Sequence, residues 1–273
     1  MSDSLDGRAA AFDVQAGSFD RRAGLPPAAV DRIARTLREI CPQGLLLELG
    51  AGTGEIGAAL IAAGSRYAGL DVSLGMLGVF RGRSGRAPLF LADADRPWPV
   101  RDGCARAVFA SRSAHRLAMD GLVAETLRAA HPDGAVFVLG RVRRERESLR
   151  AILRRQMRHL LAERGVEGRG GGEGGEEAGR SLLAAFEARG AVPLPDRTAA
   201  SWTVQERAAD SLASWRGKPG LAGTAVDPDL KREVLERLEA WARETFGTLD
   251  ITREATEAYE LAAVRLPVRE EIA

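Results

Sequence analysis

The sequence predicts an α/β fold in which helices cover both faces of a mostly parallel sheet. Three observations lead to this prediction. Short apolar segments alternate with helical segments over residues 25–142, which is the order of a parallel sheet with crossover helices. A glycine-rich loop directly follows the first apolar segment, and the first three apolar segments each end in an acidic residue.

The elements of this first half follow one another regularly. Residues 26–40 predict a helix, because two prolines stand at its start and its apolar residues fall on one face. Gly64 ends the helix that follows the glycine-rich loop. From residue 45 onward the predicted elements are a strand at 45–49, a helix at 55–63, a strand at 67–73, a helix at 73–83, strands at 87–94 and 105–115, a helix at 119–130 and a strand at 135–142.

The alternation stops after residue 142. Residues 143–165 predict a long amphipathic helix with leucine, isoleucine and methionine on one stripe. The glycine-rich stretch at 168–179 is typical of a mobile loop. The remaining predictions are helices at 181–190, 203–216 and 228–246, a strand or irregular connection at 191–204, and a closing strand at 255–266.

The composition limits the classes of partner. The formal net charge is only +1, from 39 basic and 38 acidic residues. Nucleic-acid binding by general electrostatic attraction needs a basic excess on one face, so we do not expect a nucleic-acid partner. The arginines of residues 141–158 are interleaved with glutamates and an apolar stripe, which favours an amphipathic helix with a charged outer face over a phosphate-binding surface.

The cysteines, histidines and hydropathy suggest a reduced, cytoplasmic protein. Cys41 and Cys104 are too few for a disulfide scaffold and are not spaced as a metal knuckle. The three histidines lie far apart in the sequence, so no metal site is expected. The first residues show no signal pattern, and no apolar run approaches the length of about 18 residues that a membrane span needs. We therefore expect no membrane partner.

The glycine-rich loop matches two different patterns. Residues 52–57 fit the dinucleotide fingerprint G-x-G-x-x-G, and residues 48–54 fit acid-x-G-x-G-x-G. The dinucleotide loop begins at the end of the strand, where Gly50 stands, and counting from there puts Glu55 where the third glycine is required. Glu48 would also repel a pyrophosphate, whereas a ligand with an amino group and a cationic sulfur would tolerate it. The register favours the second pattern.

The stretches "LLLELGAGTGEIGAAL", "YAGLDVSLGML", "LFLADADRPWPVRDG", "AVFASRSAHRL" and "HPDGAVFVLG" together resemble the core of class I S-adenosylmethionine-dependent methyltransferases, in the small-molecule, type 11-like branch. The resemblance covers roughly residues 40–142. It implies a Rossmann-like, doubly wound, seven-stranded sheet with a helical cap, whose last strand is antiparallel and lies beside the fifth. It also implies S-adenosyl-L-methionine as cofactor and S-adenosyl-L-homocysteine as product.

The resemblance assigns the glycine-rich loop to the cofactor. Gly50, Gly52 and Gly54 would pass under the methionine and ribose portions, with Ala51 between them. Glu48 would help to orient the methionine amino group. Glycine suits these positions because a Cβ would hold the ligand away, or because the turn needs a positive φ.

The resemblance also assigns residues after the second, third and fourth strands. Asp71 would accept both ribose hydroxyls in a charge-assisted pair, beside Val72. Asp93 would meet the adenine amino group, with the backbone of Ala94 near the ring. A helix cap or a turn acid is the alternative for the two aspartates. The remaining assigned positions are Met76, against the adenine, and Ser111, which borders both cofactor and substrate.

Two further residues are candidates for the substrate side. His115 is the histidine expected nearest to the acceptor, and a general base must reach the acceptor proton and titrate near neutrality. A loop histidine that is hydrogen-bonded to the backbone explains it as well. Trp215, in "SWRGKPGLAG", fits either a substrate-facing lid or a packed helix end. Both alternatives stay open for both residues.

These patterns divide the chain into four expected parts: an N-terminal lid segment at 1–24, a cofactor-binding core at 25–142, a helical cap at 143–254 with the glycine-rich loop at 168–179, and a closing strand with a tail at 255–273. The expected function is methyl transfer to an O or N atom of a small molecule in an enclosed pocket, by a monomer or homodimer. Three alternatives remain: a methyltransferase acting on RNA or protein, an NAD-dependent oxidoreductase, and a non-catalytic member of the fold.

Overall fold

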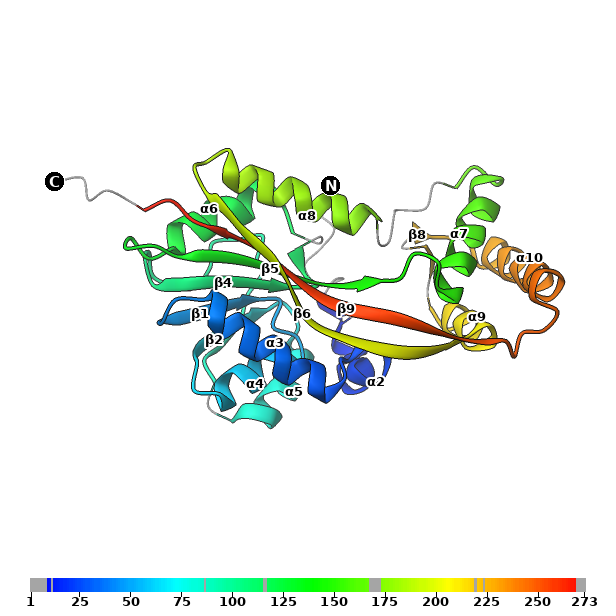
Figure 1. Ribbon diagram of the computed structural model, residues 1–273, viewed down its shortest axis with the longest axis horizontal. Helices are drawn as coiled ribbons and strands as arrows, with labels where there is room; N and C mark the ends of the chain where they lie inside the picture. Colours follow the sequence, from blue (N-terminus) through cyan, green and yellow to red (C-terminus); the bar gives the residue numbers. More distant parts are fainter. Residues whose placement is uncertain are drawn as a thin grey trace. The chain divides into compact units, whose positions relative to one another are not determined.

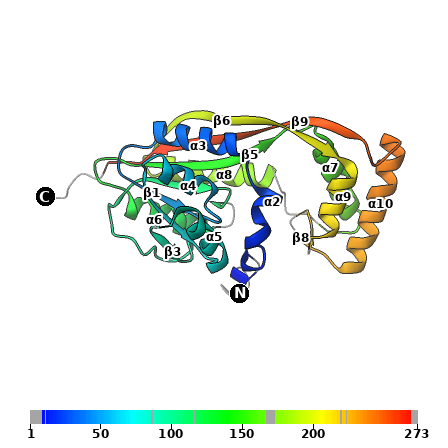
Figure 2. The same cartoon turned by 90° about the horizontal axis from the view of Figure 1, so that it is seen from below.

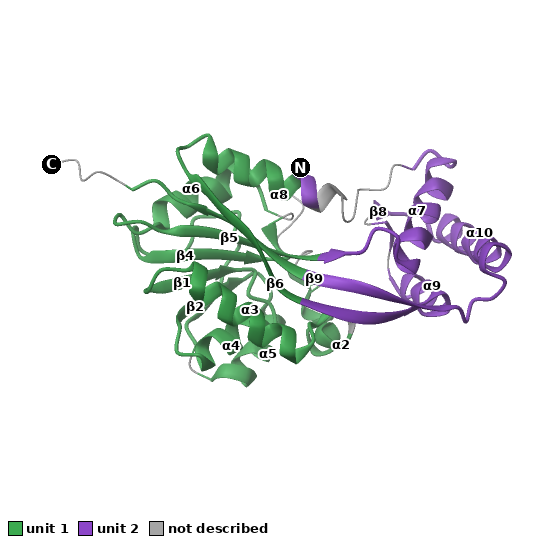
Figure 3. Cartoon of the chain, in the orientation of Figure 1, with its two compact units in different colours: residues 1–142, 178–200, 259–273 green, residues 143–177, 201–258 purple. Residues whose placement is uncertain are grey.

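The structure is a computed structural model that describes residues 9–10, 12–85, 87–114, 117–166, 173–218, 220–222 and 224–268. The chain divides into two compact units, which Figure 3 distinguishes by colour. Unit 1 comprises residues 1–142, 178–200 and 259–273, and unit 2 comprises residues 143–177 and 201–258.

A seven-stranded sheet has the strand order β3-β2-β1-β4-β5-β9-β6 (Figure 1). Strands β1 to β5 pair in parallel, and β9 is antiparallel. This confirms the predicted mostly parallel sheet with its antiparallel last strand beside the fifth. The strands are β1 (Leu45–Leu49), β2 (Arg66–Asp71), β3 (Leu89–Leu91), β4 (Ala105–Ser111), β5 (Val136–Arg144), β6 (Val192–Arg207) and β9 (Thr252–Arg265).

Three helices pack in sequence along one face of the sheet (Figures 1 and 2). They are α3 (Pro27–Ile40), α4 (Glu55–Ala62) and α5 (Leu74–Ser84). Strand β2 points Tyr67 toward this face, where its ring lies 5.7 Å from the ring of Phe80 in α5. Because α4 and α5 belong to right-handed crossovers in the same direction, they lie on the same side of the sheet.

The opposite face carries α6 (Met119–Ala129) and α8 (Glu173–Glu187). Phe186 of α8 packs on Phe137 of β5, with 4.6 Å between the ring centroids. The helix begins at Glu173, so the predicted glycine-rich loop at 168–179 is wrong from residue 173 onward, and its residues 168–172 lie outside the described part. A Cβ on Gly179 would come within 2.9 Å of Leu139, so this glycine lets the helix lie close to the sheet.

Unit 2 has a core of its own. Helices α7 (Leu149–Ala162), α9 (Ala208–Arg216) and α10 (Pro228–Phe246) contact one another and bury a cluster of leucines with Trp215. A short hairpin joins β7 (Gly220–Leu221) to β8 (Thr224–Ala225). In the described part of the chain, none of the helices has both the length and the apolarity needed to cross a membrane.

Two further segments differ from the prediction. Strand β6 continues to Arg207, where a helix was expected from residue 203, because residues 201–207 alternate between exposed and half-buried with a period of two. In the N-terminal segment, where no element was predicted, the chain forms the short helices η1 (Ala16–Ser18) and α2 (Phe19–Ala23). Helices of this length depend on tertiary contacts and leave no periodic pattern in the sequence.

Candidate functional site

A cavity of unit 1 lies at the carboxyl ends of β1, β2, β3 and β4. The strand order reverses between β1 and β4, and open α/β sheets bind ligands at such a reversal. Every residue predicted to bind the cofactor lines this one cavity: Glu48, Gly50, Ala51, Gly52, Gly54, Asp71, Val72, Met76, Asp93, Ala94 and Ser111. Residues from five separate segments therefore meet at one edge of the sheet.

The glycine-rich loop has a backbone that other residues rarely adopt. Gly50, Gly52 and Gly54 have φ angles of 69°, 56° and 79°, in the left-handed region where glycine carries no steric penalty. A Cβ on Gly54 would lie 2.2 Å from the ring of Phe80, and one on Gly50 would lie 2.7 Å from the Cβ of Ser113. The loop thus needs glycine both for its turn and for its close packing.

Glu48 is a buried carboxyl group, with 3% of its surface exposed. The hydroxyl of Tyr67 donates a hydrogen bond to its Oε2 at 2.5 Å. Burial raises the pKa of Glu48 to about 8, although the Tyr67 hydrogen bond and the charge of Arg112 act in the opposite direction. Near neutral pH this carboxyl group is mostly protonated, and a cationic group beside it would favour its ionised form.

Asp71 ends β2 and is also buried. Its two carboxylate oxygens each accept one backbone hydrogen bond at 2.8 Å, from Gly52 and from Ser73. Burial raises the pKa of Asp71, and these N–H groups oppose the shift. Ser73, whose Oγ accepts from the backbone N–H of Met76, is the side-chain cap of α5. Since a carboxylate oxygen can accept a second hydrogen bond, Asp71 can also hold a pair of ligand hydroxyls.

The two aspartates after β3 have different surroundings. Asp93 lines the cavity. The Oδ1 atom of Asp95 accepts from the backbone N–H of Ala118 at 2.7 Å, next to the start of α6. Asp93 also accepts from the backbone N–H of Asp95 at 3.0 Å, which closes a short turn. Of the two, only Asp93 faces the cavity, so it is the one placed to meet a ligand.

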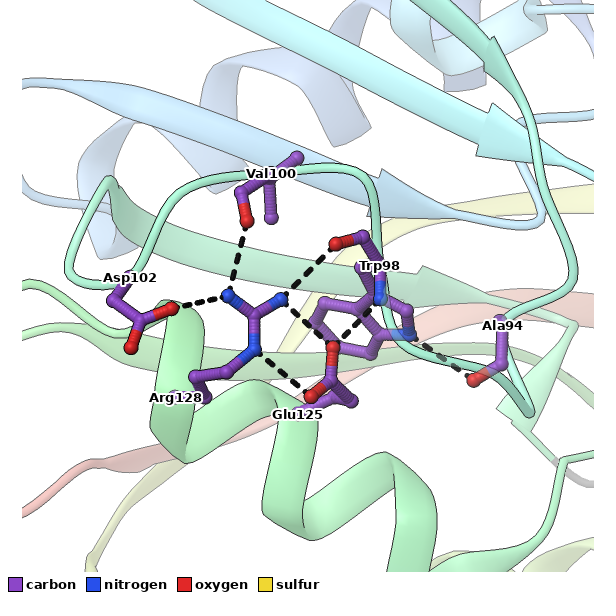
Figure 4. A network of polar contacts seen from close by, with 6 residues as sticks. All are labelled: Ala94, Trp98, Val100, Asp102, Glu125 and Arg128. Carbon is purple, nitrogen blue, oxygen red and sulfur yellow. Dashed lines mark hydrogen bonds and ion pairs between the residues drawn. The ribbon is translucent and has the colours of Figure 1, made fainter.

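A polar network holds the loop that follows β3 (Figure 4). All five guanidinium N–H groups of Arg128 donate hydrogen bonds, over distances of 2.5 to 3.1 Å. The hydrogen bonds to Glu125 and Asp102 raise the pKa of Arg128, and the hydrogen bond from Arg128 lowers the pKa of Glu125. The indole Nε1 of Trp98 donates to the backbone oxygen of Ala94 at 3.0 Å. The remaining members of the network are Val100 and Asp102.

The end of β4 carries a hydroxyl pair. The Oγ of Ser111 and the hydroxyl of Tyr259 lie 2.5 Å apart. Tyr259 belongs to β9 and is fully buried, and burial raises the pKa of its hydroxyl. Ser113 donates from its Oγ to the backbone oxygen of Leu49 at 2.7 Å. The wall of the cavity at β4 is therefore tied both to β9 and to the start of the glycine-rich loop.

Arg112 follows Ser111 with a φ of 56°, which is unusual for a residue with a side chain. Its guanidinium donates to the backbone oxygen of Ala23 at 2.6 Å and pairs with Glu55 at 3.0 Å. Such backbone strain persists only where the surroundings hold it, and it concentrates at functional sites. Here the strained backbone at Arg112 places its guanidinium group against Ala23, which precedes α3.

The N-terminal segment, defined here as residues 12–25, also contacts the cavity loops. Asp13 accepts from the Oγ of Ser73 at 2.5 Å, which together with the backbone N–H of Gly75 lowers its pKa. Asp20 accepts from the Oγ1 of Thr53 at 2.6 Å and pairs with Arg83. Two aromatic residues of this segment line the cavity: Phe12 and Phe19.

Two predicted site residues remain to be placed. His115 lies outside the described residues, so its place in the site stays a prediction. Trp215 has 3% of its surface exposed in the core of unit 2, where it packs among the leucines of α7, α9 and α10. The expectation of a substrate-facing Trp215 is therefore corrected: the indole fills a hydrophobic core.

Other residues that line the cavity were not predicted from the sequence. The available signal for Phe12 and Phe19 is two aromatic rings in an otherwise polar stretch. Thr53 lies within the glycine-rich loop motif and Glu55 directly follows it. Neither was assigned to the site, although Glu55 decided the register of the glycines. The other missed lining residues are Ile56, Leu70, Ala92, Arg112, Ser113 and Leu117.

Comparison with known families identifies part of the chain. Residues 47–138 match a family model described as methyltransferase domain. This match spans β1 to β5 and includes every predicted cofactor residue. None of the curated proteins matches the sequence.

Solved structures share the fold at low sequence identity. The [4+2]-cyclase SpnF aligns with a TM-score of 0.54 at 19% identity, over 97% of this chain and 98% of its own. A putative methyltransferase from Bacillus halodurans C-125 aligns with a TM-score of 0.53 at 14% identity, over 86% of this chain and 98% of its own. A putative type II methyltransferase from Anaeromyxobacter dehalogenans aligns with a TM-score of 0.51 at 20% identity, over 89% and 96%. At this identity the likeness concerns the fold.

Proposed function

We propose that this cavity binds S-adenosylmethionine and that the protein methylates an O or N atom of a small molecule. The match of residues 47–138 to a methyltransferase domain, which uses this methyl donor, supports the proposal. The observation that carries the proposal is the meeting of Glu48, Asp71 and Asp93 around a left-handed glycine loop. Three acids from three strand ends suit a cationic ligand that offers amino and hydroxyl groups.

The chemistry of the donor fits these residues group by group. Its ammonium group would meet Glu48, its ribose hydroxyls Asp71 and its adenine amino group Asp93. Gly50, Gly52 and Gly54 leave the backbone open to a close approach. A dinucleotide would instead bring a pyrophosphate toward Glu48 and Asp71. The carboxylate of Asp71 would repel it, and so would Glu48 wherever it is ionised. The same acids therefore weigh against the NAD-dependent alternative.

The donor supplies an activated methyl group on a sulfonium, which passes to the acceptor as the bond between sulfur and methyl breaks and its electron pair returns to sulfur. The residues of the chain align the reactants and exclude water. Such alignment contributes up to roughly 7–11 kcal/mol to lowering the barrier of a bimolecular step. The acids hold the ends of the donor, and the N-terminal segment covers the loops through Asp13 and Asp20.

The acceptor would lie in the part of the cavity that the donor does not fill. This part combines two aromatic rings, a hydroxyl and a cation, which suits a small and partly apolar molecule. The proposed base is His115, because Ser113 and Leu117 on either side of it in the sequence both line the cavity. An amine acceptor would need no base, since its nitrogen already carries a free electron pair. The remaining proposed acceptor contacts are Phe12, Phe19, Ser111 and Arg112.

The first experiment compares the binding of S-adenosylhomocysteine and NAD by calorimetry. We expect S-adenosylhomocysteine to bind and NAD not to bind. Asp71→Ala should weaken the binding about 100-fold, because it removes two hydrogen bonds to a charged group, worth about 1.5 kcal/mol each. Asp102→Ala is the matched control, since Asp102 is 71% exposed and lies outside the lining of the cavity. Binding of NAD alone would overturn the proposal.

The acceptor is then sought with a donor that carries a labelled methyl group. Small-molecule libraries, RNA and protein extracts form separate arms, and mass spectrometry detects the labelled product. Label in small molecules supports the proposal, and label only in RNA or protein replaces its acceptor class. Label in no arm, with S-adenosylhomocysteine bound, would favour a member of the fold that binds the cofactor without methyl transfer.

A further inference from the structure

Tyr67 of β2 is a buried tyrosine whose hydroxyl reaches a residue of the cavity. It has 4% of its surface exposed, and its ring packs against Phe80 of α5. The hydroxyl donates to Oε2 of Glu48 at 2.5 Å, and among the described residues Glu48 is its one hydrogen-bond partner. Burial first, and then the charge of Glu48, raise the pKa of this hydroxyl. The hydroxyl therefore stays protonated and remains a donor near neutral pH.

Two glycines leave room for the hydroxyl of Tyr67. A Cβ on Gly57 of α4 would lie 2.6 Å from the hydroxyl oxygen and equally close to Cζ of Phe80. A Cβ on Gly69 of β2 would lie 2.8 Å from the same oxygen. Gly57 is also the third glycine of the apparent dinucleotide fingerprint at residues 52–57. The structure gives this glycine another reason, because it makes room for the tyrosine that holds Glu48.

Glu48 interacts with titratable groups of β2, of β9 and of the residue after β4. Burial is the main reason that the pKa of Glu48 rises to about 8, and the hydrogen bond from Tyr67 is the strongest influence in the opposite direction. The charge of Arg112, which follows β4, also lowers this pKa, and that of Asp71 at the end of β2 raises it. The hydroxyl of Tyr259 in β9 interacts with Glu48 as well. In the described part of the chain, Tyr67 is the member of this group that is hydrogen-bonded to Glu48.

We propose that Tyr67 is a positioning residue, whose hydroxyl holds Oε2 of Glu48 and thereby keeps Oε1 in place for an ammonium group of a ligand in the cavity. Oε1 is the oxygen that remains, because Oε2 has its partner in Tyr67 and Glu48 lines the cavity. This inference rests on the proposed function, which brings the ammonium group of S-adenosylmethionine to Glu48. A hydroxyl that donates to a carboxylate favours its ionised form. Tyr67 therefore also sets the pH range in which the ligand binds.

The test compares the natural protein with Tyr67→Phe, which removes the hydroxyl and keeps the ring. Calorimetry measures the affinity for S-adenosylhomocysteine between about pH 7 and about pH 9. Without its donor, Glu48 should be half-ionised about one pH unit above its value of about 8. The affinity should then fall about tenfold at about pH 7 and only about twofold at about pH 9, where much of Glu48 is ionised before binding in both proteins. A structural defect alone would weaken binding equally at both pH values.

Two further variants serve as controls. Tyr259→Phe removes the hydroxyl of the other buried tyrosine, which is paired with Ser111, and should leave the pH dependence of binding unchanged. Glu48→Gln cannot ionise, so the effect of adding Tyr67→Phe to it should not vary with pH. Thermal unfolding verifies that each variant is folded.

A measurement without ligand separates this inference from the proposed function. Infrared spectroscopy follows the protonated carboxyl group of Glu48 through the C=O band that Glu48→Gln lacks. The band should disappear around a pH of about 8 in the natural protein and about one pH unit higher in Tyr67→Phe. Equal midpoints in the two proteins, or a loss of affinity that does not vary with pH, would overturn the inference. If the natural protein does not bind S-adenosylhomocysteine, the proposed function fails, and the infrared midpoints still confirm or overturn the hold of Tyr67 on Glu48.

Discussion

Glu48 links the protonation of one buried side chain to ligand binding and to stability. Its pKa is about 8 in the folded protein and has an ordinary value of 4.5. The folded chain therefore binds this proton more tightly than the unfolded chain does. The contribution of Glu48 to the free energy of unfolding is largest below pH 4.5 and decreases as the pH rises to about 8. A ligand ammonium beside Glu48 would reverse this preference, because it stabilises the carboxylate.

We expect the binding of S-adenosylhomocysteine near pH 7 to release roughly one proton from Glu48, since a group with a pKa about one unit above the pH is mostly protonated before binding. The affinity should then increase between about pH 6 and about pH 8 and level off above that. Calorimetry in buffers with different ionisation enthalpies counts the protons released.

Two variants identify the group that titrates. Glu48→Gln should bind the ligand without releasing a proton. Asp93→Asn, at another acid that lines the cavity, should weaken binding and still release the proton. Proton release that persists in Glu48→Gln would contradict the assignment.

At the scale of elements, replacing a glycine by alanine should destabilise the glycine-rich loop but stabilise α5, the helix after β2. Gly54→Ala puts a Cβ against the ring of Phe80 at a φ of 79°. The left-handed backbone alone costs an alanine about 1–2 kcal/mol. We expect a lower melting temperature and strongly reduced binding of S-adenosylhomocysteine, measured by thermal unfolding and calorimetry.

Gly78→Ala is the matched control for Gly54→Ala. Gly78 lies in the exposed interior of α5, where a Cβ meets no atom within 4 Å. An alanine there should raise the free energy of unfolding by about 0.5–1 kcal/mol, because glycine loses more conformational freedom in a helix. Equal losses in both variants would show that the loop geometry is not the cause.

The network of Arg128 is a second element-scale device, since it fixes the path of the loop that carries Asp93 and Ala94 (Figure 4). Arg128→Lys leaves at most three of the five donors and loses the planar fork. We expect a decrease of about 2 kcal/mol in the free energy of unfolding, from several hydrogen bonds of about 1 kcal/mol each. Ligand affinity should fall with it, although Arg128 does not line the cavity.

Asp102→Asn tests how much the exposed edge of the Arg128 network contributes to stability. Asp102 is 71% exposed and accepts one of the five hydrogen bonds, so its substitution should change the free energy of unfolding by less than about 1 kcal/mol. Denaturant unfolding and calorimetry measure both variants. If Arg128→Lys lowers the stability but leaves the affinity for S-adenosylhomocysteine unchanged, the network does not position the loop that carries Asp93 and Ala94.

Local patterns explain which elements were predictable. The glycine-rich loop and the acids at the ends of β1, β2 and β3 stand next to their strands in the sequence, so their meeting follows once the sheet is parallel. The start of α8 was missed because its glycines suggested a loop, whereas packing against Leu139 compensates their low helix propensity. The N-terminal contacts were missed because Asp13 and Asp20 find their partners about sixty residues later in the chain.

At the scale of the whole molecule, each of the two units contains a hydrophobic cluster among its described residues. The cavity belongs to unit 1, at the point where the strand order reverses. The hydrophobic cluster of unit 2 includes Trp215. The alternation of elements predicted the parallel strands β1 to β5. It could not place Trp215, because an aromatic residue near a helix end suits a core and a binding surface equally.

The N-terminal segment and the cavity loops are joined over a long sequence distance. The side chain of Asp20 in α2 contacts both Thr53 in the glycine-rich loop and Arg83 at the end of α5. We expect the binding of S-adenosylhomocysteine to slow the hydrogen exchange of amides in residues 12–25. A ligand bound by the cavity loops stabilises these loops, and with them the N-terminal segment that is hydrogen-bonded to them. Asp20→Ala should increase the dissociation rate of the ligand about tenfold, because it removes the contacts of Asp20 with Thr53 and Arg83.

Asp229→Ala in α10 is the control, since Asp229 is 80% exposed and pairs only with its neighbour Arg232 in the described contacts. Equal dissociation rates in the two variants, or exchange in residues 12–25 that does not respond to the ligand, would contradict a covering role for this segment.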